Sequence, residues 1–210
     1  MAEIGLFPLN IVLLPTERVP LHIFEARYKE LIGECLAEKK EFGIVLARAE
    51  GFANMGTRAT IVEVLDRFAD GRLNIVVEGM SRFSVDRLTE GRSYTTAEIS
   101  DVVDDSTSAS EVEMQACVEA YRTLSAAAGI VPEAPAESAM PELSHGAPAK
   151  SWDLAKLVSF PADLKQKLLE TTSEPARLAQ LTKFMIATAE VVRRNRQVRA
   201  QASGNGHVGF

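Results

Sequence analysis

Cysteine and histidine are scarce in this chain. Two cysteines, Cys35 and Cys117, occur among 210 residues, and one isolated pair makes neither a disulfide framework nor a zinc-binding spacing. Both lie among apolar residues at helical spacing, so we expect reduced thiols in the core. Because His145 and His207 are far in sequence from His22, no metal site is predicted.

Long apolar runs are absent as well. The sequence has no stretch of about 18 apolar residues, which is the length needed to cross a bilayer. The first residues lack the basic and apolar segments of a signal peptide. The formal net charge of −6 disfavours a sequence-independent grip on nucleic-acid phosphates. We therefore expect a globular, cytoplasmic protein without a membrane partner. Its charge disfavours nucleic acid as a partner.

The first half of the chain has the pattern of short strands broken by one helix. Apolar residues at positions 28, 31, 32, 35 and 36 share one helical face beginning at Tyr28. Asp70-Gly71 lies between two strand-like runs and predicts a two-residue hairpin turn with positive φ at both residues. Residues 48–56 are expected to be a loop, and Gly79 a bulge or tight corner. Six or seven such strands indicate a small barrel over residues 1–105.

The second half has a helical period from residue 106 to residue 201. Ser110 with Glu113 fits a capping box. Ser151 is expected to cap the next helix, Pro161 to open another, and Pro175 to lie in the first turn of a long last helix. These residues therefore predict a helical subdomain.

Two segments of the second half are not expected to pack. Residues 130–150 hold four of the nine prolines and few large apolar groups, so they predict a linker that is mobile or lies over the surface. Residues 202–210 are rich in glycine and are expected to form a flexible tail.

Several local patterns occur in an order that resembles the N-terminal, substrate-binding domain of Lon ATP-dependent proteases. The central one is residues 20–28, where an apolar strand runs into the helix. Leu21, Ile23 and Phe24 of this stretch are expected to contribute to the barrel core. The other matching stretches are residues 6–9, 42–46, 56–57, 70–72, Gly79-x-x-Arg82-Phe83, 153–155, 164–170 and Arg177-Leu178. The chain departs from the family at Thr16, where members usually have glycine, and at Ala26, where they usually have proline.

The resemblance implies an α+β fold, a PUA-like β-barrel of six or seven strands with one inserted helix, followed by a C-terminal α-helical bundle. It implies a non-catalytic module that binds exposed or unfolded polypeptide segments, with a separate protease or ATPase as a partner. The serine and lysine of the family's peptidase dyad have no counterpart. Residues 146–151 lack the second glycine of a phosphate loop. No catalytic residue and no cofactor are therefore predicted.

His22 and Glu25 are the one pair that could share a proton. They are three residues apart across the strand-to-helix junction. No nucleophile or third orienting group is evident beside them, so packing or a local hydrogen bond is the favoured role.

Four apolar residues are the candidate peptide-binding residues. Phe52 and Met55 lie in the predicted loop, where large apolar groups either fold against the barrel or meet a partner. Leu13 and Leu14 have the same two alternatives. Open strand edges could accept an extended peptide by main-chain pairing.

A basic cluster supports an alternative function. Residues 176–201 carry six basic residues against one acid, and the cluster itself is Arg193, Arg194, Arg196 and Arg199. Because the PUA-like fold is shared with RNA-binding domains, the alternative is RNA or nucleotide binding through this C-terminal helix. The competing interpretation is a solvated helix end whose positive charge favours the helix dipole.

Overall fold

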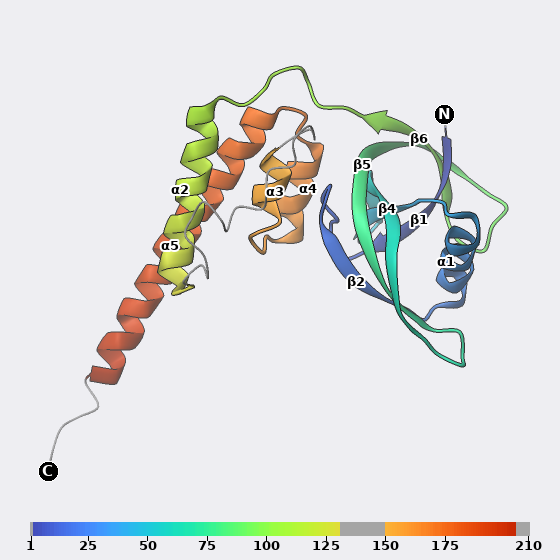
Figure 1. The fold of residues 1–210 in the computed structure, drawn as a ribbon, viewed down its shortest axis with the longest axis horizontal. Helices are drawn as coiled ribbons and strands as arrows, with labels where there is room; N and C mark the ends of the chain where they lie inside the picture. Colours follow the sequence, from blue (N-terminus) through green and yellow to red (C-terminus); the bar gives the residue numbers. More distant parts are fainter. Residues whose placement is uncertain (1, 131–149, 205–210) are drawn as a thin grey trace, which may run out of the picture. The chain divides into compact units, whose positions relative to one another are not determined.

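The structure, a computed structural model, describes residues 2–130 and 150–204, and most of the expected linker and tail lie outside these ranges. The chain forms two compact units (Figure 1), one from Met1–Asp105 with Lys156–Thr172 and one from Ser106–Ala155 with Ser173–Phe210. The strands are β1 (Ala2–Leu9), β2 (Arg18–Ile23), β3 (Phe42–Arg48), β4 (Gly51–Arg67), β5 (Leu73–Thr89) and β6 (Thr96–Val102). The helices are α1 (Ala26–Glu38), α2 (Glu111–Ala128), α3 (Lys150–Ala155), α4 (Ala162–Glu170) and α5 (Glu174–Gly204).

The predicted barrel is confirmed, but it closes unevenly. Six strands form one sheet in the order β2-β5-β4-β3-β1-β6, and β5 also pairs with β6. Strand β5 pairs with β4 along one edge. Along its other edge it has two partners in succession, because residues 73–78 pair with β2 and residues 82–89 pair with β6. Five strands therefore close a ring. Strand β2 lies outside that ring, and no described strand pairs with its other edge.

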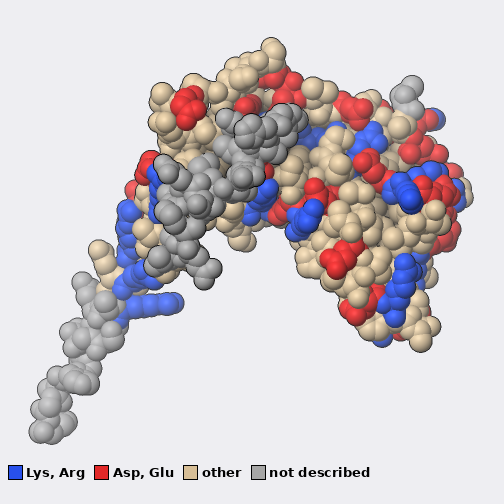
Figure 2. All heavy atoms as spheres, in the orientation of Figure 1, with Lys and Arg blue, Asp and Glu red and all other residues tan. Residues whose placement is uncertain are grey.

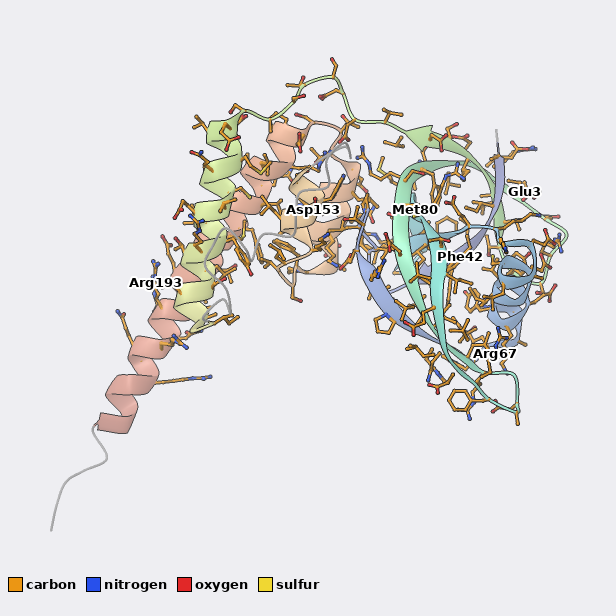
Figure 3. All side chains as sticks on the ribbon, in the orientation of Figure 1. Glu3, Phe42, Arg67, Met80, Asp153 and Arg193 are labelled. Atoms are coloured by element: carbon orange, nitrogen blue, oxygen red, sulfur yellow. The ribbon has the colours of Figure 1, made fainter. Side chains whose placement is uncertain are left out.

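Helix α1 packs the predicted apolar stripe onto the barrel. Tyr28, Leu31, Ile32 and Cys35 are buried, and the ring of Phe7 stacks on that of Tyr28 with centroids 4.0 Å apart. The interior of the barrel is filled by side chains such as Phe42, which points inward from β3 (Figure 3). Burying one large apolar side chain contributes about 1.5–3 kcal/mol, so this stripe is sufficient to fix the helix.

Two local predictions in the first half were wrong in detail. The expected loop at residues 48–56 is mostly strand, because Arg48 pairs with Gly51 and only two residues turn the chain. The hairpin at Asp70-Gly71 is confirmed, but of the two residues only Gly71 has positive φ, at 83°. Gly71 N–H donates to the Phe68 carbonyl (2.9 Å) and Phe68 N–H to the Arg72 carbonyl (3.0 Å), which makes a three-residue loop.

Gly79 forms the predicted corner, where β5 changes partners. The register between β4 and β5 shifts beside it, and a Cβ at Gly79 would lie 2.2 Å from the Leu14 carbonyl oxygen. The Gly79 carbonyl accepts a hydrogen bond from Thr16 N–H at 2.8 Å. Thr16 has a φ of 65°, a conformation that a β-branched residue rarely adopts.

Helix α4 packs on the barrel, whereas the sequence pattern placed it with the other helices. The side chain of Arg82 is 4% exposed. Its Nη1 donates to the carbonyls of Leu169 (2.7 Å) and Thr171 (3.0 Å), and its Nη2 pairs with Asp104. One guanidinium thus joins the end of α4 to β5 and to the chain beyond β6. Lys165 of α4 also pairs with Glu17.

The second unit is built on α2 and the long helix α5, which lie side by side (Figure 1). The capping box of Ser110 and Glu113 is confirmed, as is the continuous last helix. Ser151 does not cap α3 as expected, because it lies inside that helix and accepts a hydrogen bond from Arg177 Nε at 3.1 Å. The buried Arg177 guanidinium lies 4.3 Å from the centroid of the Trp152 ring.

Within residues 2–130 and 150–204, every helix is too short or too polar to cross a bilayer.

We expect Thr16→Gly to raise the free energy of unfolding by about 0.5–1 kcal/mol. The left-handed conformation costs a residue with a Cβ roughly 1–2 kcal/mol, which exceeds the roughly 0.5–1 kcal/mol of chain entropy that glycine adds. Urea denaturation followed by circular dichroism measures the change. Thr60→Gly, in the extended backbone of β4, is the matched control and should lower stability. A loss of stability in Thr16→Gly would contradict the strain argument.

Arg82→Met should weaken the attachment of α4 to the barrel. It leaves two carbonyls and Asp104 without their common donor, at a cost of about 3 kcal/mol. Hydrogen exchange at the α4 amides should accelerate, while the α2 amides keep their parental rates. The control is Arg87→Met, whose ion pair with Glu98 is exposed and therefore contributes little to stability. Equal effects of the two substitutions would show that Arg82 is not the anchor.

Candidate functional site

A cavity of about 380 Å³ opens on the barrel unit between β1 and β2. We call it the β1–β2 groove, and its lining residues are Phe7, Pro8, Leu9, Asn10, His22, Phe24, Glu25, Tyr28 and Ala47. Most of these side chains are apolar or aromatic. A cavity of this size and lining is typical of a site that holds one or two large apolar side chains of a ligand.

The groove lies where the barrel wall lacks a strand. The first half of β1 pairs with β6, from Ala2 to Gly5. Its second half, from Leu6 to Leu9, pairs with β3 alone among the described strands. Strand β2 forms the opposite wall with its unpaired edge. The cavity is therefore a direct result of the uneven closure of the barrel.

Proline interrupts both strand edges beside the groove. Leu6 N–H donates to the Thr95 carbonyl at 2.8 Å, and alternation along a strand directs the nitrogen of Pro8 to the same side. Pro20 lies in the middle of β2, and proline in a sheet places its nitrogen on the unpaired edge. Because proline has no N–H, both edges lack a donor at these positions, which disfavours the addition of another strand.

Three exposed rings form an aromatic row beside the groove, made of Phe24, His22 and Phe68. The His22 and Phe24 rings stack with centroids 5.9 Å apart, and Phe68 meets His22 edge-on at 6.2 Å. Phe24 is 59% exposed and Phe68 is 38% exposed. The expectation that Phe24 lies in the barrel core was wrong, because β2 ends at the buried Ile23 and Phe24 falls outside the strand.

Hydrogen bonds hold His22 in place and assign its protons. Asn74 Nδ2 donates to Asp66 Oδ2 (2.7 Å), so Asn74 Oδ1 faces His22 Nδ1 at 2.6 Å as an acceptor. His22 Nδ1 must then carry the proton, and Nε2 is the nitrogen left for a ligand. Glu25 does not complete a proton-sharing pair in the structure, since its carboxylate contacts Arg27 at 2.8 Å.

The groove lining lacks the side chains that most often serve as nucleophiles. It contains no serine, threonine, cysteine or lysine. Cys35 lies behind it in the core, where burial raises the pKa of its thiol to about 11, so it stays protonated at neutral pH. Within residues 2–130 and 150–204, no cluster of three metal-ligating side chains occurs. The mostly apolar lining fits the binding of an apolar segment.

The four apolar residues predicted from the sequence lie elsewhere. Leu13 and Leu14 are buried, at 1% and 0% exposed, so they support the barrel and cannot present a docking surface. Phe52 and Met55 are half-buried on β4, not in a loop. Phe52 packs against the smaller core cluster of the barrel, and the Met55 carbonyl accepts a hydrogen bond from Gln166 Nε2 at 3.1 Å.

The basic cluster lies on the C-terminal half of α5, where Lys and Arg spheres gather in Figure 2. Arg196 is engaged within the second unit, because its Nη2 donates to the Ala128 carbonyl at the end of α2 (2.9 Å). Arg193, labelled in Figure 3, and its neighbours Arg194 and Arg199 are exposed. The cluster thus includes one arginine with a structural role, and phosphate binding by the others stays a prediction.

The residues of the groove could have been found from the sequence in one way. Pro8 and Pro20 lie within apolar, strand-like runs, and proline inside a sheet marks an edge strand. Two such strands predict two edges, and side chains near them are candidates for a binding surface. The exposure of Phe24 and Phe68 has no comparable sequence pattern.

Comparisons with known proteins give a consistent result. The family model of the ATP-dependent protease La (LON) substrate-binding domain matches residues 3–187. Lon protease 2 of Myxococcus xanthus is 27% identical over 93% of this chain and 24% of that protein. Lon protease of Anaeromyxobacter dehalogenans (strain 2CP-C) is 26% identical over 97% of this chain and 25% of that protein. The chain thus spans about a quarter of the length of these curated relatives.

Two solved structures resemble the chain over most of its length. The Lon N-terminal domain protein from Xanthomonas campestris superposes with a TM-score of 0.66 at 26% identity, covering 88% of this chain and 99% of that one. The N-terminal domain of Mycobacterium avium complex Lon protease has a TM-score of 0.62 at 20% identity, covering 88% and 98%. The second likeness concerns the fold alone.

We expect Arg196→Ala to loosen the last turn of α2. The substitution removes a charged donor from carbonyls at a helix C-terminus, worth about 0.5–1 kcal/mol. Amide hydrogen exchange in the last turn of α2 should become about three- to fivefold faster. Arg194→Ala removes the same charge without a bond to α2 and should leave these rates unchanged. The capping role is wrong if both variants behave alike.

Proposed function

The chain belongs to the LON substrate-binding domain family, and from this premise we propose that it binds exposed or unfolded polypeptide segments in the β1–β2 groove. Binding involves no bond-making step by this chain. The observation that carries the proposal is a large apolar ring, Phe24, held in solvent beside an apolar cavity.

The energetics of the groove support a hydrophobic ligand. An exposed apolar ring costs free energy in water that a partner recovers by covering it, about 25 cal/mol for each Å² buried. Isolated apolar residues are common on surfaces, but a ring joined to a concave apolar lining is typical of an interaction site. His22 cannot turn away, because its bond to Asn74 fixes the ring.

The length of the curated relatives bears on what happens to a bound segment, because this chain matches about a quarter of it. The relatives named Lon protease are about four times longer than the matched region. In our proposal, a separate protease or ATPase of the cytoplasm acts on the segment that this chain holds. The chain itself contributes recognition.

We expect Phe24→Asp to reduce retention of unfolded casein at least fivefold in a pull-down with the immobilised full chain. A charge in the groove must be desolvated when an apolar segment docks. The assay is run in high salt, which screens ionic attraction and leaves apolar contacts intact. Leu88→Asp is the matched control, because Leu88 is also exposed (53%) but lies on β5 outside the groove.

The two variants distinguish binding in the groove from binding elsewhere on the chain. Loss of retention in Phe24→Asp with full retention in Leu88→Asp supports the groove. Equal retention by the parent chain and Phe24→Asp excludes it. Circular dichroism should show the same fold for both variants, since both side chains are more than half exposed.

A further inference from the structure

We infer that the aromatic row and the β1–β2 groove select proline-rich segments in the polyproline II conformation. The inference rests on the proposed function, because it names the class of segment that the same site takes. Four features carry it, namely the strand edges, the spacing of the rings, the pairing of the charges and the polar groups of the groove.

The strand edges disfavour the usual alternative for an extended ligand. A peptide that adds to a sheet gains affinity from a ladder of main-chain hydrogen bonds. Leu6 N–H is already bonded to Thr95, and Pro8 and Pro20 offer no N–H, so the ladder would lose donors on both walls. A polyproline II segment needs no ladder, because it has no regular main-chain pairing and docks on aromatic side chains.

The distances between the rings allow contact with one repeat of that conformation. The centroid separations of 5.9 and 6.2 Å give the row a span of at most about 12 Å. Polyproline II has three residues per turn and rises about 3.1 Å per residue, so residues i and i+3 share a face about 9 Å apart. Two prolines at this spacing could contact Phe24 and Phe68 together, with His22 between them.

The charges beside the row favour a ligand without charge. Arg72 lies 4.9 Å from the Phe68 centroid and pairs with Asp70 at 2.7 Å. Glu25 pairs with Arg27, and Asp66 accepts from Asn74. Arg72 and Glu25 are already paired with opposite charges of the same surface, so a charged ligand residue would gain little from them. The partner of Asp66 is a neutral amide, so its negative charge disfavours an acidic ligand residue.

Polar groups of the groove match the main chain of such a ligand. Polyproline II leaves its carbonyl oxygens free, and proline residues supply no N–H. The groove offers a hydrogen-bond donor in the side-chain amide of Asn10. The Asn10 amide can donate to carbonyls without a partner N–H, which is the polarity that a proline-rich chain requires.

The test compares three synthetic 12-residue peptides by fluorescence anisotropy with the full chain. The first repeats the unit leucine-proline-alanine, so that proline occurs at every third position. In the second, alanine replaces each proline, and the third alternates valine and threonine. We expect the proline peptide to bind at least tenfold more tightly than either of the others. A valine–threonine peptide that binds as tightly would show strand addition instead, and an alanine peptide that does so would show helix docking, and either result overturns the inference.

Variants locate the binding. Phe24→Ala and Phe68→Ala should each weaken the proline peptide at least fivefold, because the segment contacts both ends of the row. Leu88→Ala, at an exposed position outside the groove, should leave its affinity unchanged. An unaltered affinity in Phe68→Ala would overturn the inference.

The two proposals fail in different ways. If unfolded casein is retained through Phe24 but proline gives no advantage among the peptides, the inference fails and the proposed function stands. If Phe24→Asp retains casein like the parent chain, the proposed function fails whatever the peptides do.

Discussion

The barrel depends on one constraint, which is that β2 and β6 pair in succession with the same edge of β5. One half of the strand pairs with β2 and the other with β6, and the change occurs at Gly79. The Leu14 carbonyl approaches Gly79 so closely that a Cβ would lie 2.2 Å from it. Any other residue would push apart the turn at residues 14–17 and the strand. The absence of one side chain thus permits a five-stranded ring with a sixth strand outside it.

The same corner determines where the rest of the first unit attaches. Arg82 comes three residues after Gly79 and is the donor that holds the end of α4. Two features that matched the family pattern, the glycine and the arginine, therefore serve one purpose, since the first sets the path of β5 and the second uses that path to anchor a helix. Both act within the barrel unit, away from the groove lining.

The sequence was sufficient for the architecture but not for the site. The helical stripe from Tyr28, the hairpin at Asp70-Gly71 and the long last helix were predicted correctly because each depends on local periodicity or turn chemistry. Phe24 was misplaced because the end of β2 decides whether it faces core or solvent, and an apolar run does not mark that end. Leu13 and Leu14 are buried by a turn that Thr16 makes in an unfavourable conformation, which no propensity predicts.

The groove is a candidate binding surface that results from incomplete strand pairing in the barrel. A closed barrel removes edges, and here closure is incomplete between β1 and β2. Open edges invite strand addition, and Pro8 and Pro20 deny it the donors it needs. The result is an apolar cavity that admits side chains of a ligand and disfavours the addition of a strand. Selectivity at such a site comes mainly from the aromatic rings and the shape of the cavity, because the main chain of both walls has few free N–H donors beside it.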